Sequence, residues 1–367
     1  MAEIKKTATA HQFGLTDEEL KNVQEILGQN VPFELIIVPE NIPSTEGLAK
    51  SVVEKFKIES ISEPKDLTEV AYKLIENKNI VSKDKSFESK VFEIKNSNKA
   101  LAIATSMNAM FLNANAEIGA EIAVAEAYKK IVCTGAEPIA LTCDIDLESK
   151  NETVLKAIAG IKKACLKLNI SLTEQKSAKA QIPYGAIGMI GIIEDKTKRI
   201  TTDFKQKGDM IFLIGESKED ISASEYLADF HGVKKSPTPF FNLDDEIKHI
   251  EILKELTSRG LVHSASVISK GGLFFSMLES VITQNFGFDI TTDAEVRCDS
   301  YLFGESQERA IVTVASAFEE DFIDFMIANN YLFSTIGHVT KGEIRVDDES
   351  FGFIKEIKEI YEYILNK

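Results

Sequence analysis

One stretch, from Glu121 to Asp146, limits the possible fold more than any other part of the sequence. Its first half carries apolar residues at helical spacing, from Ile122 to Val132. Gly135 to Pro138 then breaks that pattern, and Ile139 to Cys143 is a short apolar run typical of a buried strand. The stretch therefore predicts a helix that leads through a tight turn into a core strand of an α/β sheet.

Two carboxylates, Asp144 and Asp146, directly follow that expected strand. Ligands of open α/β sheets bind beyond the carboxyl ends of the strands, and nucleotide-bound Mg²⁺ commonly takes one or two carboxylates. We therefore treat Asp144 and Asp146 as candidate metal ligands. The alternative interpretation is an acidic loop that faces water, since Glu148 continues it.

Composition indicates an ordinary globular protein and argues against two classes of partner. Of the 367 residues, 44% are hydrophobic and 27% are charged, enough for two domain-sized cores. The net charge of -16 argues against nucleic acid and anionic membranes, which need a basic surface. No apolar run approaches the roughly 18 residues of a membrane span, and the four cysteines form no CxxC pair. We expect a reduced, cytoplasmic protein.

Capping residues mark several helix starts. Thr16 with Glu19 forms a capping box, and Asp66 with Glu69 and Ser222 with Glu225 precede further segments in the same way. Other helices are expected near residues 151–168, 244–260, 273–282, 318–328 and 353–365. Strands are expected near residues 33–38, 100–105, 139–143, 186–193, 209–215, 262–269, 310–315, 331–339 and 343–346.

The polar segment from Glu194 to Lys207 separates two strongly apolar strands and is the expected domain boundary. We expect an N-terminal helix and extension over residues 1–60. An N-terminal domain then covers residues 61–205, and a C-terminal domain covers residues 208–367.

Several segments resemble the phosphoribosylformylglycinamidine synthase family, and in particular the C-terminal half of its synthetase subunit. They lie in family order between about residues 14 and 314, so the chain is identified as a member of that superfamily. The segments are GLTDEELKNVQEILG (14–28), NIVSK (79–83), IAVAEA (122–127), TGAEP (134–138), IGMIGIIED (187–195), SEYL (224–227) and LFGESQERAIVTV (302–314).

The resemblance implies a two-domain α/β (α+β) fold like that of aminoimidazole ribonucleotide synthetase, with an N-terminal sheet domain that dimerises and a C-terminal α/β domain. A full synthetase carries two such halves and this chain has one, so the resemblance implies a homodimer. It further implies a glutaminase or a full-length synthetase subunit as a possible partner. The implied activity is the ATP-dependent amidation of formylglycinamide ribonucleotide in de novo purine biosynthesis, with Mg-ATP as cofactor.

The chain departs from the family where the chemistry is expected. Aspartates, a histidine and a loop glycine of the family motifs are replaced, while structural glycines and apolar residues remain. The substituted segments are Ala104–Ala109 for T-T-D-C-N-P, Thr142–Leu147 for T-D-C-L-N-F, Leu172–Lys176 for S-G-N-V-S, and Ser264–Leu273 for S-A-H-D-V-S-D-G-G-L. We therefore expect a protein that is inactive or weakly active alone, without a cofactor if inactive. The alternatives are a non-catalytic subunit or scaffold, and an ATP-dependent enzyme with another substrate.

The last of these segments is also a candidate nucleotide or phosphate site. A strand, a glycine turn and a helix N-terminus follow one another there, and free N–H groups at a helix start favour an anion. Lys270 would reinforce it. The alternative is an ordinary strand-to-helix turn. The candidate residues are Ser264, Ser266, Ser269, Gly271 and Gly272.

Glu305 lies in the best-preserved motif and is a further candidate for the nucleotide site. The alternative is a structural pair between Glu305 and Arg309 at the start of a core strand. The five histidines lack metal-ligand spacing, so no catalytic residue is assigned. If the chain runs another ATP-dependent reaction, Asp144, Asp146 and Glu305 are the expected replacements for the lost ligands.

Overall fold

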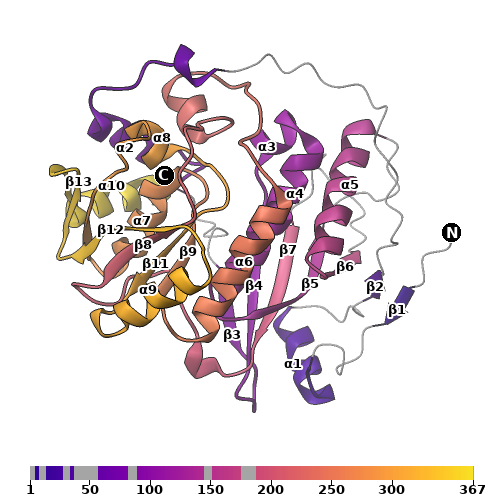
Figure 1. Cartoon of the computed structure of the whole chain (residues 1–367). Helices are drawn as coiled ribbons and strands as arrows, with labels where there is room; N and C mark the ends of the chain where they lie inside the picture. Colours follow the sequence, from indigo (N-terminus) through magenta and orange to yellow (C-terminus); the bar gives the residue numbers. More distant parts are fainter. Residues whose placement is uncertain are drawn as a thin grey trace. The chain divides into compact units, whose positions relative to one another are not determined.

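The computed structural model describes residues 5–7, 14–27, 34–36, 57–81, 89–143, 151–174 and 187–366. The chain forms two compact units, each built on its own sheet (Figure 1). The first unit comprises Met1–Ser51 and Ser86–Arg199, and the second comprises Val52–Lys85 and Ile200–Lys367. The α/β (α+β) fold class is confirmed, and the division after Arg199 lies inside the polar segment expected as the boundary.

The segment from residue 57 to 81 packs differently from the expected division at residue 61. Its helix α2 (Leu67–Ile75) belongs to the second unit rather than to the N-terminal domain. The reason is hydrophobic burial, because Val70 and Leu74 on one face of α2 lie in the core of the second unit. The observed units therefore interleave in sequence, whereas the expected domains were continuous.

The first unit is a mixed seven-stranded sheet in the order β1-β2-β6-β5-β7-β4-β3. Strand β7 is antiparallel to both β4 and β5, so β4 and β5 run in the same direction on either side of it. Their carboxyl ends therefore lie at the same edge of the sheet. The strands are β1 (Lys5–Thr7), β2 (Glu34–Ile36), β3 (Lys90–Glu93), β4 (Ala100–Ser106), β5 (Glu137–Cys143), β6 (Ser171–Glu174) and β7 (Ile187–Ile193).

Helix α4 is the expected helix before the core strand, and it is buried on nearly every side. Its charged residues are accommodated by ion pairs, Lys130 with Glu126 at 2.6 Å and Glu121 with Lys163 of α5 at 2.8 Å. Helix α1 packs its apolar residues, including Val23, on strands β4, β5 and β7. The helices are α1 (Asp17–Ile26), α3 (Ala109–Ala114), α4 (Ala116–Val132), α5 (Glu152–Lys167) and the short η3 (Lys196–Lys198).

The second unit is also built on a seven-stranded sheet, in the order β14-β13-β10-β12-β8-β11-β9. Alternation along β8 separates its two faces. Ile211 and Leu213 face the large apolar core that includes α7, whereas Phe212 contacts Phe322 of α9 with ring centroids 4.4 Å apart. The strands are β8 (Met210–Ile214), β9 (Ser264–Val267), β10 (Gly287–Ile290), β11 (Ala310–Val314), β12 (Phe333–Thr340), β13 (Glu343–Val346) and β14 (Glu349–Phe353).

Helices cover both faces of this second sheet (Figure 1). Helices α7, α8, α10 and α2 contribute to the large core, while α6 and α9 are joined by Arg259, whose guanidinium lies 5.1 Å from the Phe325 ring centroid. The helices are η2 (Ile58–Ser60), α2 (Leu67–Ile75), η4 (Tyr226–Phe230), α6 (Leu243–Ser258), α7 (Gly272–Ile282), α8 (Cys298–Phe303), η5 (Ser316–Phe318), α9 (Glu319–Ala328) and α10 (Ile354–Asn366).

Two of the three expected helix caps are confirmed. Thr16 and Glu19 form the capping box of α1, and Asp66 accepts hydrogen bonds from two backbone N–H groups at the start of α2. Ser222 was the wrong cap for the third helix. Instead the Ser224 hydroxyl accepts the Leu227 N–H at 3.1 Å at the start of η4, which is a single π-helical turn.

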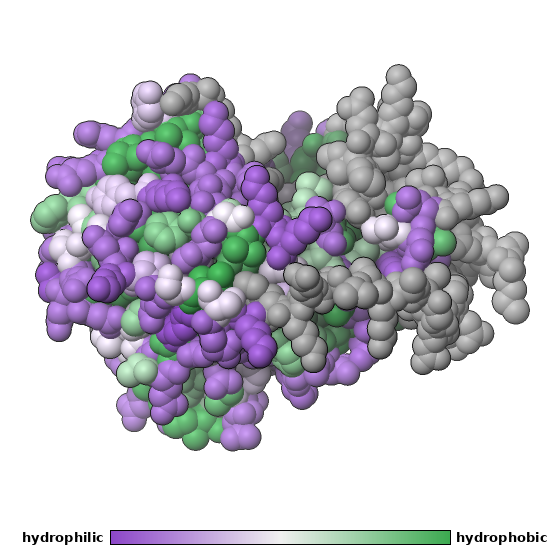
Figure 2. Space-filling model, turned by 90° about the horizontal axis from the view of Figure 1, so that it is seen from above, coloured by the Kyte–Doolittle hydropathy of each residue, from purple (hydrophilic) through white to green (hydrophobic). Residues whose placement is uncertain are grey.

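On the face seen in Figure 2, the coloured surface is mainly hydrophilic and the apolar patches are small. Among the described residues, no helix is both long and apolar enough to cross a membrane. Among the residues whose burial the structure describes, the exposed large apolar side chains are scattered over both units. They are Phe92, Leu155, Phe240, Phe318, Ile327, Leu332, Phe353 and Tyr363.

Candidate functional site

Four of the motif segments meet at one point in the second unit, around two buried carboxylates. Glu305 Oε1 accepts the backbone N–H of Glu225 at 2.9 Å and that of Gly271 at 3.0 Å. Glu225 Oε2 accepts the side-chain amides of Asn77 at 3.0 Å and Asn79 at 3.1 Å. We call this group the Glu225–Glu305 junction. It joins the NIVSK, SEYL, glycine-turn and LFGESQ segments.

Burial dominates the electrostatics of the junction. Glu305 is 2% exposed and Glu225 is 4% exposed. Burial, followed by repulsion from the neighbouring Glu225, raises the pKa of Glu305 to about 8, although its two backbone N–H donors oppose the shift. Glu305 therefore holds a proton over much of the neutral range, while both of its N–H contacts remain satisfied.

Arg309 holds the loop that carries Glu305, and it is one of the largest fully buried side chains. Its guanidinium donates to the carbonyl oxygens of Gly304 at 2.7 Å, Ser306 at 3.3 Å and Tyr301 at 3.4 Å, and to Ser217 Oγ at 3.0 Å. The structural relation expected between Glu305 and Arg309 thus runs through the backbone of the loop. Burial lowers the pKa of Arg309 to about 10.

The glycine turn is shaped by close packing. Gly271 and Gly272 both have positive φ, 77° and 73°. A Cβ on Gly272 would lie 2.7 Å from the carbonyl oxygens of Leu302 and Gly304. The Gly271 N–H points at Glu305 and the Gly272 N–H donates to the Ser269 carbonyl at 3.0 Å, so protein oxygens already occupy these first donors of α7.

The serines of the predicted phosphate segment serve the sheet. Ser264 is buried, and its hydroxyl lies 2.6 Å from Thr313 Oγ1 on the paired strand β11. The Ser266 hydroxyl contacts the adjacent Val267 carbonyl at 3.5 Å. The structure therefore brings Gly271 and Glu305 together, places the Ser264 and Ser266 hydroxyls in contacts of the strands, and uses the Ser269 carbonyl in the turn.

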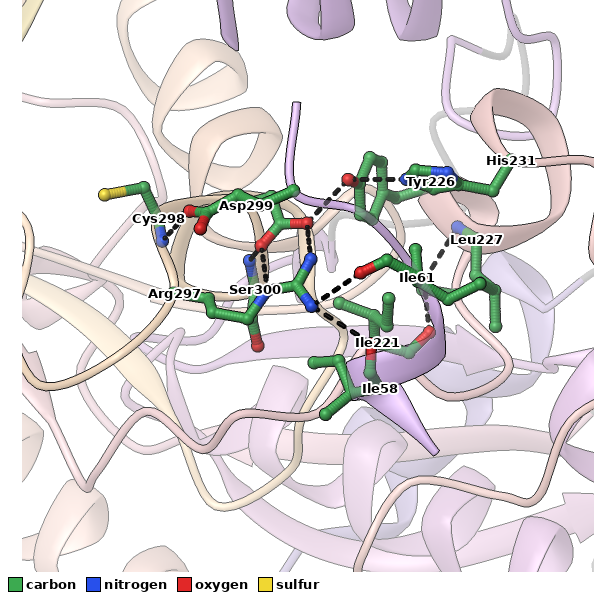
Figure 3. A network of polar contacts seen from close by, with 12 residues as sticks. Ile58, Ile61, Ile221, Tyr226, Leu227, His231, Arg297, Cys298, Asp299 and Ser300 are labelled. Carbon is green, nitrogen blue, oxygen red and sulfur yellow. Dashed lines mark hydrogen bonds and ion pairs between the residues drawn. The ribbon is translucent and has the colours of Figure 1, made fainter. Parts of the chain in front are cut away.

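A second polar network lies beside the junction, and sequence reasoning missed it (Figure 3). Arg297 donates to both carboxylate oxygens of Asp299, which is fully buried. Asp299 accepts the Tyr226 hydroxyl at 2.7 Å, and that hydroxyl lies 2.8 Å from His231 Nε2. Tyr226 belongs to the SEYL motif, so the motif was the one available signal. Arg297 and Asp299 lie in no segment that the sequence singled out.

The lost aspartate positions of the first unit meet across one strand. Ser106 at the end of β4 and Cys143 at the end of β5 both pair with Ile187 of β7, one on each side. We call these three residues the strand-end row. Ser106 and Cys143 are buried and neither supplies a carboxylate. The Lys130 ammonium donates to the Thr105 carbonyl at 3.0 Å, directly beside Ser106.

No metal-binding group of three or more His, Cys, Asp or Glu side chains exists within the described ranges. Asp144 and Asp146, the predicted metal ligands, lie outside those ranges. In the row itself a hydroxyl and a thiol stand where carboxylates are expected, and protein-bound Mg²⁺ usually takes at least one carboxylate besides its waters. The described residues therefore do not fit a Mg²⁺ site.

Known proteins match the chain in two consecutive domains and over most of its length. Residues 88–193 match the family described as AIR synthase related protein, N-terminal domain, and residues 206–349 match its C-terminal domain. Phosphoribosylformylglycinamidine synthase subunit PurL of Alkaliphilus metalliredigens is 30% identical over 341 residues, covering 83% of this chain and 46% of the relative. The Caldanaerobacter subterraneus subunit is 31% identical over 324 residues, covering 80% and 44%. The chain spans less than half the length of these relatives.

Solved structures agree on the fold. T. maritima PurL complexed with FGAR matches with a TM-score of 0.65 and 13% identity, covering 80% of this chain and 54% of that one. PurLQS from Thermotoga maritima matches with a TM-score of 0.63 and 15% identity, covering 82% of this chain and 53% of that one. T. maritima PurL complexed with ATP matches with a TM-score of 0.58 and 15% identity, covering 80% of this chain and 52% of that one.

These comparisons confirm the resemblance drawn from the motifs. The two domain families occur in the expected order, and the curated relatives align through both of them. The chain therefore belongs to the AIR synthase related family, as a relative of the phosphoribosylformylglycinamidine synthase subunit PurL.

Proposed function

We propose that this chain is a PurL-related protein of purine biosynthesis with little or no ATP-dependent amidation activity of its own. The observation that carries the proposal is the contrast between its two motif regions. The Glu225–Glu305 junction keeps the family residues that hold the second unit together, whereas the strand-end row lacks the carboxylates that the family uses for metal and phosphate.

The surroundings of the row support this proposal. The Lys130 ammonium donates to the Thr105 carbonyl beside Ser106, so a cation of the protein already contacts that oxygen. Lys130 is itself held by Glu126 at 2.6 Å, so that carboxylate is already paired. Asp144 and Asp146 remain the proposed ligands for any Mg-ATP that the chain retains.

The direct test is turnover. Purified chain is supplied with Mg-ATP, formylglycinamide ribonucleotide and ammonia, beside a complete PurL under the same conditions. Because metal catalysis commonly supplies several kcal/mol, we expect turnover at least about a thousandfold slower than that of the complete protein. Turnover within about tenfold of the complete protein would overturn the proposal.

Nucleotide binding is measured separately by thermal unfolding with and without Mg-ATP or Mg-ADP. A nucleotide at a hundredfold over its Kd adds about 2.7 kcal/mol of stability, which shifts the midpoint visibly. Because T. maritima PurL was solved complexed with ATP, a shift without turnover supports a retained nucleotide site without catalysis. The absence of any shift favours a scaffold.

The partner is a further proposal. We propose that the chain assembles with a second copy of itself, a full-length synthetase or a glutaminase; PurLQS from Thermotoga maritima, whose fold this chain resembles, supports assembly with other subunits. Strand β3 (Lys90–Glu93) ends the sheet of the first unit, and among the described strands it pairs only with β4. An edge of this kind offers unpaired backbone groups to a second strand. Light scattering on the purified chain should give the mass of a dimer, and a monomer at all concentrations would exclude the homodimer.

The third function, another ATP-dependent reaction that uses Glu305, is less well supported. Both N–H groups on Glu305 Oε1 belong to the backbone of the second unit, and the carboxyl is 2% exposed. These contacts favour a structural role for the Glu305 carboxyl.

A further inference from the structure

The segment from residue 57 to 81 belongs to the second unit, although the chain on both sides of it belongs to the first. Its two halves are attached to the second unit in different ways. In the second half, α2 and the turn after it bury apolar side chains that are at most 2% exposed. In the first half, none of residues 57–65 is buried, and Ile58 and Ile61 are only partly covered by the core. We call residues 57–65 the strap.

Within the described chain, the polar contacts of the strap with the rest of the second unit come from two consecutive residues (Figure 3). Arg297 Nη1 donates to the carbonyl oxygens of Ile58 at 3.1 Å and Ile61 at 2.9 Å. The Cys298 N–H donates to Glu63 Oε1 at 3.0 Å. Each contact involves an ionised group and is therefore stronger than a neutral hydrogen bond. Arg297 and Cys298 together form a catch that holds the strap.

The catch is anchored independently of the strap, on a buried carboxylate. Arg297 Nε and Nη2 donate to the two oxygens of Asp299 at 3.1 and 2.7 Å, and Asp299 has no exposed surface. Asp299 also accepts the Ser300 N–H at 2.8 Å and the Tyr226 hydroxyl at 2.7 Å. Release of the strap therefore leaves the buried charge fully paired. Of the Arg297 donors it frees only Nη1, on a side chain that is 16% exposed.

The two halves of the segment should therefore differ in the free energy needed to open them. Opening the strap breaks the contacts of the catch and exposes two partly buried isoleucines. Removing α2 would instead expose fully buried side chains of the core, including Val70 and Leu74. Regions with few buried apolar contacts open locally at a lower free energy than the core does.

We propose that the strap opens and closes on the second unit as one piece, while α2 stays in the core. Arg297 and Cys298 are its catch, and Asp66, which caps α2, is its hinge. The chain passes from the first unit to the second after Ser51 and reaches α2 through the strap. Opening therefore lengthens one of the chain connections between the two units. The inference goes beyond the proposed function and does not depend on it.

The test is amide hydrogen exchange of the full chain in urea concentrations below the unfolding transition. The Ile61 N–H, which donates to the Ile58 carbonyl at 2.9 Å, and the Cys298 N–H report the strap. The Leu74 N–H reports α2. After correction for intrinsic rates, both strap amides should exchange at least about tenfold faster than Leu74 and without dependence on urea, because a local opening exposes little surface. One common rate and urea dependence for all three amides would overturn the proposal.

Glu63→Gln weakens the catch from the side of the strap, outside the core. A charge-assisted hydrogen bond becomes a neutral one, so Ile61 and Cys298 should both exchange at least about threefold faster. Glu59→Gln is the matched control, because Glu59 is an exposed glutamate of the same strap that makes no contact with the catch in the described structure. Equal rates in the two variants, or a faster Cys298 amide with an unchanged Ile61 amide, would overturn the proposal.

Val70→Ala makes the opposite change, in the core under α2. Both the closed and the open strap keep Val70 buried, so this variant should leave Ile61 and Cys298 unchanged. Leu74 should exchange at least about tenfold faster, because two buried methyl groups are lost. If Val70→Ala accelerates all three amides by the same factor, the strap opens only when the second unit unfolds and the proposal is wrong.

Discussion

The strand-end row of the first unit and the Glu225–Glu305 junction of the second unit derive from the same family pattern but keep different parts of it. At the row, Ser106 and Cys143 stand where the family has carboxylates, and both are buried beside Ile187. At the junction, Glu225 and Glu305 remain and each accepts two hydrogen bonds.

The two regions differ in what their carboxylates do for folding. A buried carboxylate with all its donors in place is costly to remove, because the donors would be left unsatisfied. A metal-binding carboxylate has no such role in folding, and its loss leaves a stable strand end. We therefore expect the junction carboxylates to stabilise the fold, whereas under the proposed function the substituted positions of the row have lost only a role in metal binding.

The largest effect is expected at Arg309. Replacing it with Met removes the donors to three carbonyl oxygens and to Ser217 Oγ, all in the buried loop of the junction. Each unsatisfied buried acceptor costs about 1–3 kcal/mol. Arg309→Met should therefore lose at least about 3 kcal/mol of unfolding free energy in urea. Arg309→Lys keeps the positive charge but lacks the planar guanidinium, so its unfolding free energy should lie between those of the parent and Arg309→Met. A loss below about 1 kcal/mol would show that the loop does not depend on this side chain.

Ser106→Asp tests the other side of the comparison by restoring a carboxylate to the row. Ser106 is 4% exposed, so the added charge should cost about 2–3 kcal/mol without a metal. If the row is otherwise a competent metal site, Mg²⁺ should recover part of this loss in the variant and none in the parent. Ser106→Asn is the neutral control. An equal response of parent and variant to Mg²⁺ would mean that the missing carboxylate is not the defect.

The glycine turn separates close packing from backbone strain. Gly272→Ala places a Cβ 2.7 Å from two carbonyl oxygens at φ 73°, and we expect a loss of about 2–3 kcal/mol. Gly208 has φ 91° but open space around it, so Gly208→Ala carries strain alone and should lose about 1 kcal/mol. If Gly272→Ala and Gly208→Ala lose the same unfolding free energy in thermal or urea unfolding, close packing at Gly272 contributes nothing beyond backbone strain.

The protonation of Glu305 predicts a pH dependence of stability. Its folded pKa is raised to about 8 from 4.5, so the folded state binds the proton more tightly than the unfolded state. Its stabilising contribution is complete below pH 4.5 and is lost as pH rises through about 8. Glu305→Gln mimics the protonated form. It should match the parent near pH 4.5 and exceed it by at least about 1 kcal/mol above pH 8.

The control for this series is Glu219→Gln, since Glu219 is exposed on the same unit. Its unfolding free energy should follow the parent at every pH. If Glu305→Gln also follows the parent from acid to alkaline pH, the Glu305 carboxyl is ionised throughout and the raised pKa is wrong.

Many helices and strands could be predicted from the sequence, because each depends on residues that are close together along the chain. The opening helix and strand became α4 and β5, and the capping box at Thr16 formed. The interleaving of α2 with the second unit was not predictable in this way. It rests on contacts of Val70 and Leu74 with residues far along the chain.

The candidate site shows the same limit more strongly. The motifs located Glu305 and Gly271, yet only the fold shows that the Gly271 N–H donates to the Glu305 carboxyl. Arg297 and Asp299 carry no recognisable spacing, and their network depends on Tyr226 from a distant segment. Single-chain reasoning finds residues with chemistry, but it cannot tell which of them satisfy one another.

The smallest expected effect lies at the start of η4. The sequence predicted a cap at Ser222, whereas the structure shows the Leu227 N–H bound to the Ser224 hydroxyl. Ser224 is fully buried, and its hydroxyl accepts the Leu227 N–H at 3.1 Å and donates to the Ile221 carbonyl at 2.7 Å. Ser224→Ala should therefore cost about 1 kcal/mol, the usual value of a lost intramolecular hydrogen bond. Ser222→Ala should cost less than about 0.5 kcal/mol, as for a side chain outside the cap. The reverse order in urea unfolding would restore the sequence interpretation. It would also mean that the SEYL segment is held at Ser222, ahead of the junction that Glu225 and Tyr226 anchor.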